Sequence, residues 1–470
     1  MVVGNVPEAV DFVVVGSGPG GYTAALEAAR RGRRVTLIDP DGDDGIGGVC
    51  LRVGCIPSKT LIEAAETFHR TLHGAAMGIT ASDVRFDMVR FQRWKDERVQ
   101  LLAGGVAGLL KRANVTVKRG HLRIAEPGTV VVSDGDGGAQ FLMYEDLLLA
   151  TGSSPMPLSV LPVDGTRVVD STGALALEHV PETVAVVGAG YIGLELGTAL
   201  AKLGAAVTIV EAADRILPSM DASLNRPLKR RLGELRVEVK LDAEVYGADE
   251  QHLLARQNGA DLQIPAELVV VAVGRRPNTG DLGLEDAGVA VDEIGLIPVD
   301  ENRTAAPRIA AVGDITPGPA LAHKATAEAR VAVAALNGQP AAFSPQAIPI
   351  VVFSDPEIAS VGVGAVEADE AGVDVRKTTL PITASGRAAT MGQRIGYAEC
   401  VSDEADGALL GVTLVGPHAS ELIAEASLAI EMGVTLEDLS LTIHPHPTLS
   451  EQFQELALSA GGVGPVQPVG

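Results

Sequence analysis

The sequence predicts an α/β protein with two Rossmann-like dinucleotide-binding domains and a separate C-terminal α+β domain, and three observations support this prediction. A glycine-rich turn between a short apolar strand and an alanine-rich helix occurs twice, at residues 16–21 and 188–193. Each turn is followed by a second strand that ends in an acidic residue. Beyond residue 343 the pattern changes to apolar strands typical of an antiparallel sheet and one amphipathic helix.

Length, charge and cysteine content limit the possible classes of protein. The 470 residues favour three or four domains, at roughly 150 residues per domain. With 37 basic and 60 acidic residues the net charge is −23, which disfavours binding to nucleic acid or to an anionic membrane. Three cysteines exclude a secreted disulfide scaffold. Residues 1–11 contain no basic residue and no apolar signal segment, so we expect a cytoplasmic protein.

The first βαβ unit begins with the strand 11–15 and ends with the strand 35–38 and Asp39. Gly16 permits the turn, Gly18 allows the backbone to approach a pyrophosphate, and Gly21 allows the helix to pack closely. The second unit repeats this arrangement, and in both units the first glycine lies 23 residues before the acid. Its corresponding residues are Gly188, Gly190, Gly193 and Glu211.

One glycine turn alone would be an ordinary strand-to-helix loop, because 54 glycines make such a pattern common by chance. The repetition at identical spacing makes two dinucleotide sites the better interpretation. Asp39 and Glu211 are expected to accept hydrogen bonds from ribose hydroxyls. The next basic residue after Glu211 is Arg215, so the second site is expected to prefer NAD to NADP.

The other segments have the patterns of ordinary elements. The stretch 84–112 resembles a helix with a charged face, 115–143 is rich in strand formers, and the apolar runs 146–152 and 268–274 resemble the last strands of the two nucleotide-binding units. The C-terminal region is expected to contain strands at 348–353, 396–401 and 409–415 and a helix at 420–432.

Cys50 and Cys55 lie soon after the first unit. A bridge over five residues would stabilise the fold little, because stabilisation grows with the length of the closed loop. A reactive disulfide is the better interpretation, since Gly54 would allow close contact with a planar ring and a helix starting here would favour a thiolate. Two inert core thiols are the alternative. Without a second pair of ligands a zinc site would be incomplete, so we expect no metal.

The segment 47–59, Gly-Gly-Val-Cys-Leu-Arg-Val-Gly-Cys-Ile-Pro-Ser-Lys, resembles the pyridine nucleotide-disulfide oxidoreductases, and in particular their dihydrolipoyl dehydrogenase branch. The resemblance covers nearly the whole chain. Its other motifs are Ala150-Thr151-Gly152, Val312-Gly313-Asp314 and the segments 273–279, 321–325, 353–357 and 446–451.

The resemblance implies the division of the chain and its cofactors. Residues 1–152 would be the first part of an FAD-binding domain, 153–276 an NAD-binding domain, 277–344 the second, central part of the FAD-binding domain, and 345–470 an interface domain for dimerisation. The residues implied to bind FAD are Gly16, Gly18, Gly21, Asp39, Lys59, Thr151, Gly152, Gly313, Asp314 and Ala322. Those implied to bind NAD are Gly188, Gly190, Gly193, Glu211 and Gly274.

The resemblance also implies the catalytic groups. Cys50 and Cys55 would form the redox disulfide, and Lys59 paired with Glu195 would lie next to the flavin. Without the resemblance, the two histidines of the segment 444–447, His-Pro-His-Pro, would be interpreted as surface residues or as metal ligands. By resemblance His446 is the base, Glu451 orients it, and the two act on the disulfide of the other subunit, so the enzyme would be a homodimer. It would reoxidise dihydrolipoyl groups of 2-oxoacid dehydrogenase or glycine cleavage complexes, with lipoyl domains and acyltransferase cores as partners.

Two alternatives differ in substrate or in class. The first is another NAD(P)H-dependent disulfide reductase of the same architecture; a mercuric reductase would need a cysteine pair after Cys400, and a glutathione reductase would need arginines near Glu211. The second is a non-catalytic binding subunit, which the intact cysteine pair and His446 disfavour. Relatives usually have threonine at Val49 and asparagine at Arg52, and a cation at position 52 is expected to stabilise a thiolate.

Overall fold

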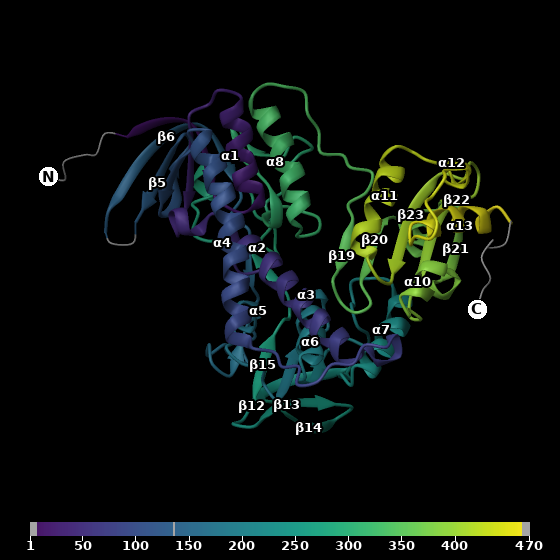
Figure 1. The fold of residues 1–470 in the computed structure, drawn as a ribbon. Coiled ribbons are helices and arrows are strands. Elements are labelled where there is room, and N and C mark those ends of the chain that lie inside the picture. The colour runs from purple at the N-terminus through teal and green to yellow at the C-terminus, as the bar shows by residue number, and fades with distance from the viewer. Residues whose placement is uncertain (1–6, 135–136, 463–470) are drawn as a thin grey trace.

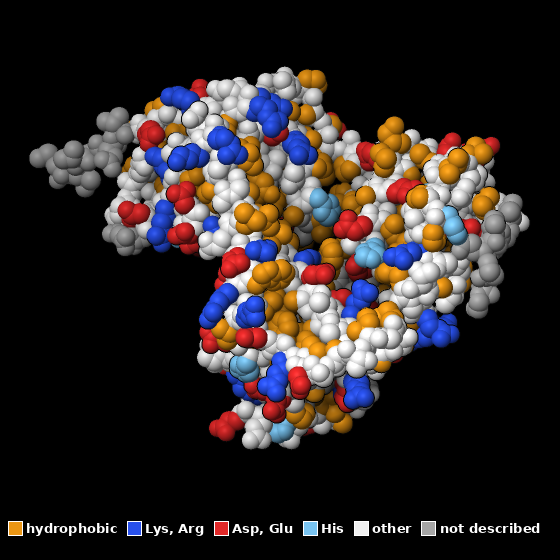
Figure 2. Space-filling view, in the orientation of Figure 1, with side chains coloured by type: hydrophobic (Ala, Val, Ile, Leu, Met, Phe, Trp, Pro, Cys, Tyr) orange, Lys and Arg blue, Asp and Glu red, His pale blue; other side chains and the backbone are white. Residues whose placement is uncertain are grey.

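The computed structural model describes residues 7–134 and 137–462, and its elements form three groups in Figure 1. The N-terminal group lies at the upper left, the second group lies below it around α6 (Tyr191–Lys202), and the C-terminal group, coloured green to yellow, lies at the right. Figure 2 shows this face of the molecule hollowed between the three groups. The outer ends of the first and last predicted domains, 1–6 and 463–470, lie outside the described residues.

The first sheet is built around β1 (Glu8–Val15), which pairs in parallel with β2 (Val35–Asp39) and β6 (Ala139–Leu149). The last four residues of β1 are buried, as expected for a strand covered on both faces. Phe12 and Val14 pack on alanines of α1 (Pro19–Arg30) and α8 (Ala322–Leu336), whereas Val13 and Val15 belong to the core on the opposite face. Further strands of this sheet are β3 (Thr116–Arg119), β4 (His121–Glu126) and β5 (Thr129–Ser133).

The chain returns to this sheet after it has formed the second group. β18 (Ile309–Ala311) pairs in parallel with β6, and β17 (Thr304–Ala306) pairs with β18 in the antiparallel direction. The first group therefore combines two parts of the chain that are far apart in sequence. The predicted domain boundaries after residues 152, 276 and 344 stay predictions.

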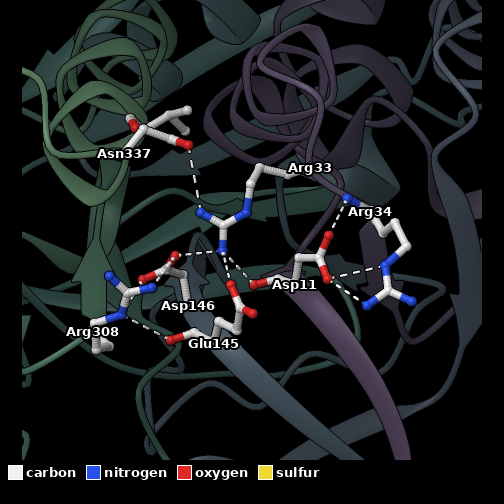
Figure 3. Close-up of polar contacts among 8 residues, drawn as sticks. Asp11, Arg33, Arg34, Glu145, Asp146, Arg308 and Asn337 are labelled. Atoms are coloured by element: carbon white, nitrogen blue, oxygen red, sulfur yellow. Dashed lines mark hydrogen bonds and ion pairs between the residues drawn. The ribbon is translucent and has the colours of Figure 1, made fainter.

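A network of charged residues holds the strands together at one end of this sheet (Figure 3). Asp146 on β6 is fully buried, and its carboxylate accepts hydrogen bonds from Arg33 at 2.7 Å and from Arg308 at 2.9 Å. Burial raises the pKa of Asp146, although both guanidinium groups oppose this shift. On β1, Asp11 pairs with Arg34 at 2.6 Å. The network thus joins β1, β6 and the segment before β18.

Three helices follow the first βαβ unit. They are α2 (Gly48–Arg52), α3 (Cys55–Leu72) and α4 (Met88–Arg112). The helix predicted at 84–112 is confirmed as α4, which begins after Asp87, whose side chain accepts a hydrogen bond from the Arg90 amide at 2.9 Å. α3 extends from the first group to the second, where it packs on α6 (Figure 1).

The second sheet has the strand order β11-β10-β9-β15-β8, and all its pairs are parallel. Its strands are β8 (Val168–Val169), β9 (Thr183–Val187), β10 (Ala206–Val210), β11 (Glu238–Lys240) and β15 (Leu268–Val271). The turn at 188–193 connects β9 to α6, as predicted. The helices α5 (Ser171–Ala174) and α7 (Asn225–Glu234) complete this group.

Two smaller sheets accompany it. One was not predicted and consists of β12 (Ala243–Ala248), β13 (His252–Gln257) and β14 (Ala260–Pro265). The other pairs β7 (Ser153–Pro155) with β16 (Arg275–Pro277) and so connects the segments that enter and leave the second group.

The C-terminal group is an antiparallel sheet covered by helices, in the order β19-β20-β23-β22-β21. The three predicted strands are confirmed as β19 (Ile350–Val352), β22 (Tyr397–Asp403) and β23 (Leu409–Val415), and the predicted helix as α11 (Ala419–Glu431). The prediction missed β20 (Ile358–Gly362) and β21 (Val375–Pro381). The other helices are α9 (Ala365–Glu370), α10 (Gly386–Thr390), α12 (Leu436–Leu441) and α13 (Glu451–Ala460).

These sheets confirm the predicted fold class of two parallel α/β units followed by an α+β domain. Within residues 7–134 and 137–462, every helix is too short or too polar to cross a membrane.

Candidate active site

A cavity of about 820 Å³ lies between the first and second groups of elements. Many of the predicted site residues line it, and they come from the first turn, the cysteine segment, α6 and the segment 313–322. These residues are Gly16, Gly18, Asp39, Cys50, Cys55, Lys59, Thr151, Gly152, Glu195, Gly313, Asp314 and Ala322. The predicted residues outside this lining are Gly21, Gly188, Gly190, Gly193, Glu211, Gly274, His446 and Glu451.

The first turn has the close packing that its glycines predict. Gly16 has a φ of +93°, and a Cβ on Gly21 would lie only 1.7 Å from the carbonyl oxygen of Gly16. At Gly18 a Cβ would meet no atom within 4 Å, so the backbone there is open to the cavity. Gly18 is also the N-cap of α1 and supplies no side-chain cap, which leaves amides of the first helical turn available to an anion.

The two acids occupy equivalent positions in their units. Asp39 accepts hydrogen bonds from the amides of Ser17 and Asp41, both at 3.0 Å. Glu211 accepts from the amide after the first glycine of its own turn, that of Ala189, at 2.7 Å, and from the amide of Ala213 at 2.9 Å. Each acid therefore also fastens its glycine turn to the end of the adjacent strand.

Asp314 lies in a hydrogen-bonded cluster at the cavity wall. Ser153 donates its hydroxyl to the Asp314 carboxylate at 2.5 Å, and Arg275 donates from Nε to the Ser153 hydroxyl at 2.8 Å. On the neighbouring wall, Thr151 donates to the carbonyl oxygen of Asn278 at 2.6 Å, and the Asn278 amide group donates to the Thr151 carbonyl at 3.0 Å.

A buried charge cluster lies behind Gly313. Glu328 is fully buried and accepts from the Gly313 amide at 2.7 Å. Its carboxylate pairs with Lys324 at 3.1 Å and with Arg303 at 2.9 Å. Burial lowers the pKa of Lys324, and Glu328 opposes that shift. The position of the loop that contains Asp314 is therefore fixed by ionic contacts from α8 and from the segment before β17.

The two cysteines are in contact at the cavity. Both are free thiols in the structure, with Cys50 half-buried at α2 and Cys55 exposed at the first residue of α3. The predicted helix start at this place is confirmed. The hydrogen bond with Cys50 and the charge of Lys59 together lower the pKa of Cys55 to about 7, although burial opposes them. The same contact raises the pKa of Cys50. Cys55 is therefore the sulfur that ionises first.

Lys59 pairs with Glu195 at 2.7 Å, although the two are 136 residues apart in sequence. Lys59 lies one turn beyond Cys55 on α3, and Glu195 is buried in the middle of α6. The aromatic ring of Phe353 lies 4.5 Å from the Lys59 ammonium. This arrangement places a positive charge near the thiol that ionises.

His446 and Glu451 form a hydrogen-bonded pair in the C-terminal group. His446 Nδ1 lies 2.8 Å from one carboxylate oxygen of Glu451, and the Thr448 amide donates to the other at 2.8 Å. The side chain of His446 is 70% exposed. Because Glu451 holds Nδ1, Nε2 is the ring nitrogen that faces outward. His444 instead is buried and lies 2.7 Å from Glu425 on α11.

Three other residues, Arg52, Tyr191 and Cys400, have ordinary surroundings. Arg52 donates to the carbonyl oxygens of Ile46 at 2.9 Å and Asp43 at 3.2 Å, so its effect on a thiolate stays a prediction. Tyr191 lines the cavity, and burial raises its pKa. Cys400 is buried in the C-terminal core, where it packs as a small apolar residue, and burial raises its pKa to about 12.

Comparison with known protein families identifies the family to which a chain with this site belongs. Residues 10–329 match the family described as pyridine nucleotide-disulphide oxidoreductase, and residues 348–457 match the dimerisation domain of that family. The chain belongs to the pyridine nucleotide-disulphide oxidoreductases. The resemblance seen in the sequence is thereby confirmed, and the C-terminal group of elements is the dimerisation domain of an oxidoreductase of this family.

Individual members of the pyridine nucleotide-disulphide oxidoreductase family are similar over almost the whole chain. The dihydrolipoyl dehydrogenase of Geobacillus stearothermophilus is 45% identical, with 98% of each chain covered. Dihydrolipoyl dehydrogenase 2 of Haloarcula marismortui is 44% identical over 98% of this chain and 99% of its own. Among solved structures, LpdA of Mycobacterium tuberculosis has a TM-score of 0.88 at 29% identity, covering 96% of this chain and 99% of that chain.

Several residues that hold the site were not found from the sequence. Ser153 and Arg275 orient Asp314, Glu328 holds Gly313, and the backbone of Phe353 contacts Glu195. Arg275 and Phe353 lie in the segments 273–279 and 353–357, which resemble family motifs, but neither residue had a predicted role of its own. Glu328 gave a weaker signal, as an acid four residues after a lysine on one helix.

Proposed function

We propose that this chain is the flavoprotein that reoxidises dihydrolipoyl groups of 2-oxoacid dehydrogenase or glycine cleavage complexes and passes the electrons to NAD⁺. One observation carries the proposal: a paired, readily ionised thiol at the start of α3 shares a cavity with the first glycine turn and with the Lys59–Glu195 ion pair. The names of relatives that are 44–45% identical over nearly the full length support the choice of substrate.

The residues of the first turn fit FAD. The open backbone at Gly18 and the uncapped start of α1 suit a pyrophosphate, the Asp39 carboxylate in the same cavity suits a ribose hydroxyl, and the cavity continues past the cysteines to Asp314. The residues assigned to FAD are those predicted from the sequence. Bound FAD supplies a two-electron acceptor and hydride donor, which links the oxidation of a dithiol to the reduction of NAD⁺.

The residues of the second turn fit NAD. Gly190 is the N-cap of α6 without a side-chain cap, and a Cβ there would meet no atom within 4 Å. Glu211 ends the next strand, where an acid favours a ribose hydroxyl over a 2′-phosphate. Gly188, Gly193 and Gly274 complete this site.

The chain's own groups carry the thiol chemistry. A substrate thiol loses its proton to Nε2 of His446, and the resulting thiolate attacks Cys50 of the Cys50–Cys55 disulfide. A bond forms between the substrate sulfur and Cys50, and Cys55 leaves as a thiolate, stabilised by Lys59 and by the start of α3. The second substrate thiol then displaces Cys50, which releases the oxidised lipoyl ring and leaves both cysteines reduced.

The active unit in this proposal is a homodimer. His446 and Glu451 do not line the cavity of their own chain, as expected if they serve the cavity of the other subunit, and residues 348–457 match a dimerisation domain. Lipoyl domains are the substrate carriers and an acyltransferase core is the binding partner. The cytoplasmic location expected from the sequence belongs to the same proposal.

The test is NAD⁺ reduction by dihydrolipoamide with the purified, flavin-containing dimer, compared with NADPH oxidation by glutathione disulfide. We expect rapid turnover only in the first assay. Cys50→Ser and Cys55→Ser should each abolish it, while Cys400→Ser serves as the matched control and should retain it. Turnover only with glutathione disulfide would favour the other reductases of this fold, and a flavin-containing dimer inactive in both assays would favour a non-catalytic subunit.

A further inference from the structure

Two ion pairs connect α3 to α6, and they are one heptad apart on both helices. Lys59 of α3 pairs with Glu195 of α6 at 2.7 Å, and seven residues further along both helices Glu66 pairs with Lys202 at 2.5 Å. Residues seven apart lie on one face of a helix, about 10 Å apart along the axis. The order of charges is reversed between the two helices, so only this register places each lysine against a glutamate.

A single segment of the C-terminal group contacts both ion pairs. The Phe353 amide donates to Glu195 at 3.0 Å, and the Phe353 ring lies 4.5 Å from the Lys59 ammonium. Two residues later, Asp355 pairs with Lys202 at 2.7 Å. We name residues 353–355 the strap, because they cross from the first pair to the second.

The strap is itself fixed by the second group of elements. Arg231 of α7 donates to the Asp355 carboxylate from two nitrogens, at 2.8 and 2.9 Å. Burial would raise the pKa of Asp355, but Lys202 and Arg231 outweigh it and the pKa is lowered, so the carboxylate is charged at neutral pH. A partly buried carboxylate held by two cations keeps its geometry well, because either cation is costly to leave without its partner.

We propose that the strap is a positioning device through which the C-terminal domain holds Lys59 and Glu195 in place beside Cys55. Phe353 and Asp355 are then positioning residues for the redox site, although neither lines the cavity. The inference rests on the proposed function in one respect, the assignment of Cys55 as the reactive thiol next to FAD. It adds that the dimerisation domain acts on the redox site of its own chain as well as supplying His446 to the other subunit.

The strap affects the ionisation of Cys55 through the titratable groups that face this thiol. These groups are Cys50 from α2, Lys59 from α3, Glu195 and Tyr191 from α6, and Tyr22 from α1. Of these, Lys59 favours the thiolate and Glu195 disfavours it. The Phe353 amide holds the Glu195 carboxylate in place as the partner of Lys59, and the Phe353 ring attracts the Lys59 ammonium. Loosening the strap leaves Lys59 less well held beside Cys55, so the Cys55 thiolate should be less favoured.

The experiment measures the ionisation of Cys55 in the holoenzyme without turnover. In a Cys50→Ser background, the long-wavelength absorbance that a thiolate gives next to oxidised flavin is titrated with pH. Asp355→Asn and Phe353→Leu should each raise its midpoint by roughly half a unit or more, a fraction of the effect of a full neighbouring charge. Glu357→Gln is the matched control, because Glu357 follows the strap but its carboxylate binds only Ser420 among the contacts the structure gives it, at 2.8 and 3.0 Å. It should leave the midpoint unchanged.

A second background distinguishes positioning through Lys59 from general loosening of the fold. With Lys59→Met added, the strap substitutions should cause no further shift, because the charge they position is gone. If Asp355→Asn fails to retain flavin, Phe353→Leu decides the question, since it keeps the backbone amide and an apolar side chain. Unchanged midpoints in the strap variants, equal shifts in Glu357→Gln, or persisting shifts with Lys59→Met would each overturn the proposal. A parent without any thiolate absorbance would instead contradict the proposed function.

Discussion

The replacement Glu451→Gln tests whether His446 is the base, because the surrounding hydrogen bonds leave the new amide little choice of orientation. One carboxylate oxygen of Glu451 accepts from the Thr448 amide and the other from His446 Nδ1. A glutamine has only one oxygen, and the Thr448 N–H requires it. The NH₂ group must then face Nδ1, which makes Nδ1 an acceptor and places the ring proton on Nε2. In that tautomer the outward nitrogen cannot accept a proton from a substrate thiol.

The magnitude follows from the cost of the alternative orientation. Turning the NH₂ group toward Thr448 restores the productive tautomer but leaves an amide N–H without an acceptor, which costs about 1–3 kcal/mol. At about 1.36 kcal/mol per tenfold change in rate, we expect kcat to fall roughly 5- to 150-fold. His446→Gln removes the base altogether and should cost roughly 10²- to 10⁴-fold. Glu451→Gln should therefore lie between the wild type and His446→Gln.

The assay is steady-state NAD⁺ reduction by dihydrolipoamide, with oxidation of NADH by ferricyanide as a reaction that needs no thiol base. Only the first reaction should slow. Glu425→Gln is a matched control, since it makes the same change next to the buried His444, which has no assigned part in the chemistry, and should leave turnover unchanged. Wild-type kcat in Glu451→Gln, or an equal loss in the ferricyanide reaction, would refute the assignment of the pair.

Three further outcomes are expected. Alkylation of reduced enzyme at Cys55 should accelerate as the pH rises through about 7, where this thiol ionises; a midpoint near the ordinary value of 9 would contradict the contact with Cys50. Gly193→Ala should abolish NAD binding in calorimetry but leave flavin content unchanged, because its Cβ would lie 2.0 Å from the Gly188 oxygen. Glu328→Gln leaves buried Lys324 without its counter-charge and should lower the free energy of unfolding by about 3–5 kcal/mol, measured by chemical denaturation; retained stability would argue against the ionic cluster as a support of Gly313.

Features that depend on local sequence could be predicted well. Gly16 and Gly188 act within their own turns, and Cys55 at the start of a helix is a property of a few neighbouring residues. The strands β19, β22 and β23 were also found, because apolar runs bounded by turn residues mark them. In contrast, β21 carries polar residues on most positions, so its sequence has no apolar run to mark a strand.

Features that depend on distant partners could not be predicted without the fold. In the sequence, Glu66, Lys202 and Asp355 look like ordinary helix or loop charges. They become one network only because α3 packs on α6 and the strap packs on both helices. The pairing of Lys59 with Glu195 was expected only because relatives have it. Charge alone does not reveal a partner 136 residues away, since most charged helix positions face solvent.

The two glycine turns are built alike, yet their surroundings differ in a way that suits one resident and one exchanging cofactor. Over the first turn, the Gly47 amide donates to the Ser17 carbonyl at 3.0 Å, and Gly48 lies so close that its Cβ would be 2.6 Å from Gly18 Cα. The cysteine segment thus covers the first turn, and release of a dinucleotide from it would require that segment to move. Gly190 of the second turn lies outside the cavity that this cover helps to form. In the proposed function, this difference would keep FAD at the first turn and let NAD⁺ exchange at the second, because the hydrogen bonds that Ser17 and Ala189 donate to Asp39 and Glu211 are equivalent in the two turns.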